Sequence, residues 1–69
     1  MITLSQIQTR IAEAITQSGM KQTELAKQLR VTQSAISHIV NGDILPALDT
    51  LANLCKILDV DANYILCLE

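Results

Sequence analysis

The side chains best suited to specific recognition in this 69-residue sequence lie between positions 33 and 38. Gln33, Ser34, Ser37 and His38 recur at the spacing of one outward helix face. All four are neutral or switchable hydrogen-bonding groups without a long charged side chain. Such a face can read the edges of base pairs in duplex DNA. We interpret it as a candidate base-reading surface.

The sequence lacks the residue sets that catalysis requires. It has one histidine, no Gly-rich phosphate loop, and carboxylates that are scattered rather than paired. Cys55 and Cys67 have neither CxxC spacing nor neighbouring histidines, so we expect reduced packing residues and no metal site. Recognition of single strands by stacking needs several aromatic rings, and Tyr64 is the one aromatic residue. We expect no enzyme, no cofactor and no small-molecule ligand.

The spacing of apolar residues and the capping residues predict five short helices that position these groups. The helices are expected over residues 5–18, 22–29, 33–40 after a Thr32 cap, a stretch entered at Pro46 in its first turn, and 62–68 after an Asp61 cap. In the fourth helix, the residues expected to face inward are Leu48, Leu51, Leu54, Cys55 and Leu58. No alternating strand pattern is present. The expected fold class is therefore all-α, a single domain over residues 1–69.

Residues 22–42 predict that the second and third helices meet at a sharp turn. Ala26 is small where two helices must approach closely, and Val31 fills the turn. The apolar side chains expected to fill the angle between the helices are Leu25, Leu29, Ile36 and Ile39. This spacing is typical of a helix-turn-helix.

Several motifs resemble the helix-turn-helix family of phage Cro and lambda-type repressors, also called the XRE family. They are Gln22-x-x-Leu-Ala, Val31-Thr32-Gln33-Ser34-x-Ile36-Ser37, Asn41-Gly42, Pro46 and Leu58-x-Val60 before a final helix with Tyr64. The resemblance covers nearly the whole chain. It implies a compact five-helix, lambda-repressor-like domain whose third helix enters the major groove of a double-stranded DNA operator.

The resemblance also assigns roles to residues. Gln33 is implied to read an adenine, with Ser34, Ser37 and His38 at the other base-facing positions. Gln22 is implied to hold a phosphate and to brace Gln33. The full set expected to contact phosphates is Lys21, Gln22, Lys27, Arg30, Thr32, Asn41 and Gly42. The apolar end of the chain suggests a homodimer contact through Tyr64, Ile65 and Leu68.

Four positions depart from the family pattern. Arg30 stands where many relatives have Gly, which would place a β-carbon in a left-handed turn. Ile15 and Val40 are apolar where many relatives have an ion pair. Asp43 follows Asn-Gly in place of a basic residue, and Lys21 replaces a Ser or Thr cap. We therefore expect backbone affinity to rest on four cations, which are Arg10, Lys21, Lys27 and Arg30.

Charge leaves alternatives open. The net charge of −2 and the pI near 5.1 disfavour nucleic-acid binding, but residues 1–42 carry four cations against two carboxylates, and the remainder is acidic. We expect a cytosolic prophage or bacterial repressor without a membrane span. A restriction-modification controller or an antitoxin that represses its own operon is the alternative within the same DNA-binding class. A module that sequesters a partner protein through the acidic C-terminal part is the alternative of another class.

Overall fold

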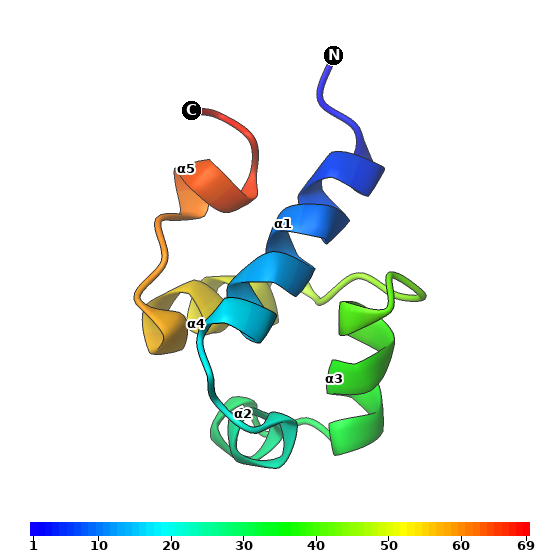
Figure 1. Ribbon diagram of the computed structural model, residues 1–69, viewed down its shortest axis with the longest axis vertical. Coiled ribbons are helices and arrows are strands. Elements are labelled where there is room, and N and C mark those ends of the chain that lie inside the picture. The colour runs from blue at the N-terminus through cyan, green and yellow to red at the C-terminus, as the bar shows by residue number, and fades with distance from the viewer.

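The computed structural model describes residues 1–69 and contains five α-helices and no strand, which confirms the all-α prediction. The helices are α1 (Leu4–Gln17), α2 (Gln22–Leu29), α3 (Gln33–Val40), α4 (Leu48–Leu58) and α5 (Ala62–Ile65). Both termini lie at one end of the molecule and α2 lies at the other, with α3 along one side (Figure 1). None of these helices has the length and apolar character needed to cross a membrane.

Side-chain caps fix where three of the helices begin. Thr3 and Gln6 form a reciprocal capping box at the start of α1. The Thr32 hydroxyl accepts a hydrogen bond from the Ala35 backbone N–H at 3.1 Å, which starts α3 as predicted. Asp61 accepts one from the Asn63 N–H at 2.9 Å and starts α5. Each cap satisfies an amide that would have no partner inside its helix.

Left-handed residues fix where the helices end. Arg30 has φ 59° and ψ 40°, so its backbone is left-handed. As expected from the absence of glycine at this position, a residue with a β-carbon adopts the strained turn conformation. The Val31 N–H then reaches back to the Ala26 carbonyl at 3.0 Å. Asp59 repeats this geometry after α4, with φ 54° and ψ 47°. Both ends are Schellman-type closures, which satisfy carbonyls of the last helical turn.

The core joins all five helices through nine buried apolar residues. These are Ile11, Ile15, Leu25, Ala26, Ile36, Ile39, Leu54, Cys55 and Ile65. Val40 packs against this cluster, of which Ile15 is a member, so the two positions that depart from the family pattern both belong to the apolar interior. Leu29 and Val31 also pack against it from the turn between α2 and α3. The packed core therefore sets the angle between these two helices.

The structure corrects three helix predictions. Pro46 lies outside α4, because Ala47 is extended and caps a helix that begins at Leu48. Leu48 was expected to face inward but is 85% exposed, since it is the first helical residue and no neighbouring helix covers it. The last helix ends at Ile65 rather than near Leu68, because the backbone reverses at Cys67, whose φ is 62°.

Candidate nucleic-acid interface

The second and third helices form the predicted helix-turn-helix around fully buried side chains. Leu25 and Ile36 are both 0% exposed, and Ala26 is 4% exposed where α2 meets α3. The absence of a bulky side chain at Ala26 lets the helices approach closely. The opposite face of α3 is left outside the core and open to solvent.

The N-terminal turn of α3 presents unpaired hydrogen-bonding groups. Gln33 and Ser34 are exposed, and no intramolecular partner engages either side chain. Their backbone N–H groups also lack an acceptor within the chain, because the Thr32 cap is used by Ala35. Free amides at a helix start favour anionic ligands such as phosphate. The structure therefore brings two predicted base-reading side chains together with two free backbone donors.

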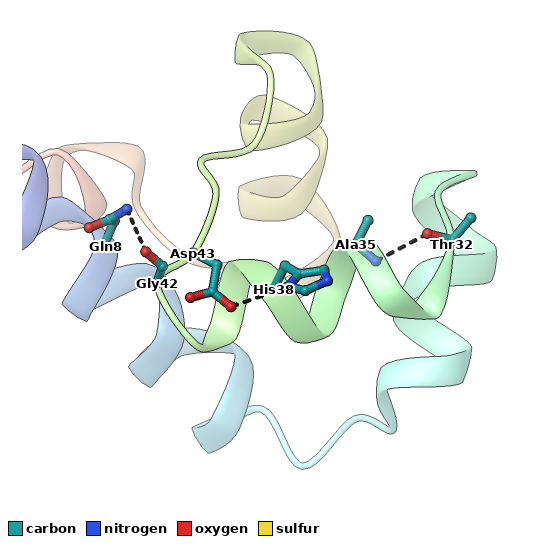
Figure 2. Close-up of polar contacts among 6 residues, drawn as sticks. All are labelled: Gln8, Thr32, Ala35, His38, Gly42 and Asp43. Carbon is teal, nitrogen blue, oxygen red and sulfur yellow. Dashed lines mark hydrogen bonds and ion pairs between the residues drawn. The ribbon is translucent and has the colours of Figure 1, made fainter.

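His38 lies on the same helix but has a partner. Its Nδ1 is 3.2 Å from Oδ2 of Asp43, in the segment that follows α3 (Figure 2). Ser37 is half-buried and is less open to solvent than Ser34. Asp43, which replaces the basic residue of the family pattern, therefore has its carboxylate paired with an imidazole. Residues 33 and 34 are thus freely available, whereas His38 is already oriented.

The exposed cations flank the turn without ion-pair partners. Lys21, Lys27 and Arg30 are all exposed, and the one ion pair in the structure joins His38 to Asp43. Lys21 occupies the capping position of α2 without a side-chain cap bond, so its ammonium group is free for a phosphate. These three positions remain candidates for backbone contacts.

Arg10 does not share this surface, contrary to the expectation. Its guanidinium donates to the Tyr64 carbonyl at 2.6 Å and lies 4.6 Å from the centre of the Tyr64 ring. The cation thus holds α5 against α1. The same region holds a carboxyl pair, in which a hydrogen bond with Asp61 raises the pKa of Glu69. Arg10 therefore serves the fold at the end where the termini meet.

The remaining residues predicted to contact phosphates, Gln22, Asn41 and Gly42, differ in their exposure and hydrogen bonds. Gln22 is half-buried, and its side chain makes no hydrogen bond to Gln33, so the implied bracing is absent from the free chain. Asn41 is exposed at the end of α3. The Gly42 carbonyl accepts a hydrogen bond from Gln8 Nε2 at 3.2 Å (Figure 2). Gln8 was not predicted to matter, because this contact joins residues 34 positions apart and has no local signal.

The exposed apolar residues correct the predicted dimer contact. Ile65 is 1% exposed and belongs to the core, so it is not available to a second chain. Tyr64 and Leu68 are 39% and 62% exposed and remain candidates. A second apolar group was missed: it consists of Ile44, Leu45 and Leu48. These three side chains lie in the loop after α3 and at the start of α4.

Comparison with known proteins adds two similarities. A family model described as helix-turn-helix matches residues 11–65, which span the second part of α1, all of α5 and everything between them. The chain is also 37% identical over 46 residues to the "ImmF control region 10 kDa protein" of Bacillus phage phi105. That match covers 67% of this chain and 51% of the phage protein, so it spans about half of the relative's length. No solved structure matches the chain.

Proposed function

The chain belongs to the helix-turn-helix family, which includes the phage Cro and lambda-type repressors, and we propose that it is a DNA-binding repressor that recognises a two-fold operator as a homodimer. The observation that carries this proposal is the exposed, unpaired start of α3. There Gln33 and Ser34 present free side chains and free backbone amides, and the same helix-turn-helix carries the exposed, unpaired cations Lys27 and Arg30. A surface of this composition is complementary to a groove lined by base edges and phosphates.

In this mechanism the start of α3 enters the major groove. The Gln33 amide pairs with N6 and N7 of an adenine, and Ser34, Ser37 and His38 face the neighbouring base pairs. Phosphates on either side bind the groups expected from the family pattern, which are Lys21, Gln22, Lys27, Arg30, Thr32, Asn41 and Gly42. No cofactor or small ligand takes part.

The name of the phage relative supports a regulatory role in a phage or prophage. That protein is described as part of a control region. A restriction-modification controller and an antitoxin that represses its own operon use the same mode of DNA binding, and the neighbouring genes distinguish the three. Each acts on genomic DNA, which places the proposed site of action in the bacterial cytoplasm.

The proposed dimer buries the apolar group formed by Ile44, Leu45 and Leu48. Leu48 is 85% exposed, and covering a side chain of this size contributes on the order of 1.5–3 kcal/mol. The group directly follows the reading helix along the chain, so a two-fold contact there would couple the positions of two α3 helices. In a two-fold operator these helices enter grooves about 34–36 Å apart.

Selection from a pool of randomised DNA duplexes tests the proposal. We expect enrichment of a palindromic site, and we expect Ser34→Asp to abolish it because a carboxylate at the groove repels phosphates and base acceptors. Asn53→Asp adds the same charge on exposed α4 and serves as the matched control. Failure of the parent protein to enrich any sequence at low salt would contradict DNA recognition and favour the module that sequesters a partner protein.

A further inference from the structure

We infer that Asp43 is a positioning residue that fixes the tautomer of His38 and thereby sets which bases the Nε2 atom of His38 recognises. The inference rests on the proposed function for its DNA part, while the tautomer itself is a property of the free protein. It gives a role to a carboxylate that would otherwise only repel the DNA backbone.

The contact between the two side chains is specific. His38 Nδ1 lies 3.2 Å from Asp43 Oδ2, and no other carboxylate lies within ion-pair distance of the ring. The side chains are 55% and 59% exposed, so the imidazole is held along one edge while the rest of it remains accessible. Figure 2 shows the Asp43 carboxylate beside His38, with a dashed line joining the two side chains.

The backbone places Asp43 in position for this contact. Gly42 adopts φ +80°, which a glycine reaches without steric cost, and its N–H donates to the Ile39 carbonyl at 3.1 Å. The Asp43 N–H donates to the His38 carbonyl at 2.9 Å. Together these bonds form a Schellman closure. Gln8 then ties the Gly42 carbonyl to α1, so Asp43 is held under His38 by both its own helix end and a neighbouring helix.

The chemistry of the pair determines which ring nitrogen of His38 carries the hydrogen. An ionised carboxylate only accepts hydrogen bonds, so Nδ1 of His38 must carry the hydrogen that joins them. In the neutral ring Nε2 is then an acceptor. It can take a hydrogen from the amino group of adenine or cytosine, whereas the Nε2–H of the other tautomer would donate to O6 or N7 of guanine, O4 of thymine or N7 of adenine. Asp43 therefore selects for amino-bearing bases through His38 without touching DNA.

Nitrogen NMR of the free protein tests the tautomer directly. The chain has one histidine, so both imidazole nitrogen signals come from His38, and their couplings to the two ring C–H protons distinguish Nδ1 from Nε2. In a spectrum recorded at alkaline pH, we expect protonated Nδ1 and bare Nε2. In Asp43→Ala we expect the Nε2–H form that dominates in free imidazole side chains. Asp43→Asn keeps an oxygen acceptor and should retain more of the Nδ1–H form than the alanine variant.

Selection of operators by the same variants tests the consequence. We expect the parent protein to prefer adenine or cytosine over guanine or thymine at one position, and this preference to fall about five- to tenfold in Asp43→Ala. Asp49→Asn removes one negative charge elsewhere and should leave the preference unchanged. Circular dichroism verifies that each variant is folded.

The outcomes separate the two proposals. An Nε2–H tautomer in the parent protein, or an unchanged tautomer in Asp43→Ala, overturns the inference whatever the DNA result. A changed tautomer with unchanged base preference overturns the specificity role. Absence of all duplex binding overturns the proposed function, whereas the NMR experiment still tests whether Asp43 fixes the tautomer of His38.

Discussion

At the scale of residues, the polar face of α3 contains groups with different degrees of freedom. Gln33 and Ser34 are exposed and unpaired, whereas His38 is fixed by Asp43 at 3.2 Å. A flexible amide can adapt to a base pair, but it loses side-chain entropy on binding. A ring that is already oriented loses less. We therefore expect base recognition by Gln33 to carry the larger entropic cost and recognition by His38 the smaller one.

Replacement of Gln33 by alanine tests the principal base contact. We expect Gln33→Ala to relax discrimination at one operator position by on the order of 1–3 kcal/mol, because a bidentate amide–adenine pair is lost. Competition binding against single-base operator variants measures this loss. Gln17→Ala, at the exposed end of α1, is the matched control. Unchanged discrimination in Gln33→Ala would refute the assigned role.

Replacement of Lys21 by alanine tests a phosphate contact. We expect Lys21→Ala to weaken specific and non-specific binding alike and to reduce the slope of log affinity against log salt by about one unit. Lys56→Ala removes the same charge from exposed α4 and should leave the slope unchanged. Equal slopes for Lys21→Ala and the parent would exclude the contact.

At the scale of elements, the helix ends show where this sequence accepts backbone strain. Arg30, Asp59 and Cys67 have φ values of 59°, 54° and 62°, and each would adopt this region more easily as glycine. Arg30 ends the first helix of the helix-turn-helix, next to the reading helix. An arginine there adds a cation to the candidate DNA surface at the expense of backbone strain.

Substitution of Arg30 by glycine should separate these two effects. We expect Arg30→Gly to raise the free energy of unfolding by about 0.5–1 kcal/mol, because relief of left-handed strain exceeds the added entropy of the unfolded chain. We also expect a smaller salt slope for DNA binding. Asp59→Gly relieves the equivalent strain after α4 and should stabilise the chain without reducing that slope. Urea titration measures the stability, and destabilisation by both variants would disprove the strain argument.

At the scale of the whole molecule, a nine-residue core supports the candidate DNA-binding side and leaves other apolar groups in solvent. A domain of this size buries a modest fraction of its surface, so each core residue and each covered apolar group matters for stability. Cys55 lies in this core, whereas Cys67 is half-buried. The two thiols therefore allow the packing of the core to be tested, and Leu48 allows association between chains to be tested.

Ionisation of the buried Cys55 thiol makes the stability of the fold depend on pH in the alkaline range. Burial raises its pKa above the ordinary value of 9.0, and the nearby charge of Asp61 adds to this effect. The buried neutral thiol therefore stabilises the fold fully below pH 9.0, and this contribution is lost as the pH rises toward the raised pKa. We expect urea titrations to show this decline in the parent and in Cys67→Ser, but not in Cys55→Ala. The same decline in Cys55→Ala would assign it to another group.

Replacement of Leu48 by aspartate tests the proposed dimer contact. We expect Leu48→Asp to shift sedimentation toward the monomer and to weaken binding to palindromic DNA more than to a half-site, because burying a charge in an apolar contact is unfavourable. Leu68→Asp tests the C-terminal contact predicted from the sequence and should leave the dimer intact. Dissociation by Leu68→Asp alone would move the interface to the C-terminal end.

The sequence by itself determined the helical elements and the turn between α2 and α3. Those features depend on interactions between near neighbours, such as the Thr32 cap and the apolar spacing that buries Leu25 and Ile36. The same local patterns predicted an exposed start of α3 with Gln33 and Ser34 outside the core.

Only the tertiary structure decided which partners distant residues meet. It engaged Arg10 with Tyr64, placed Ile65 in the core and left Leu48 in solvent. It also joined Gln8 to Gly42 and thereby held Asp43 beneath His38. A residue's charge or hydropathy does not specify these outcomes, because they depend on how the packed helices bring separate parts of the chain together.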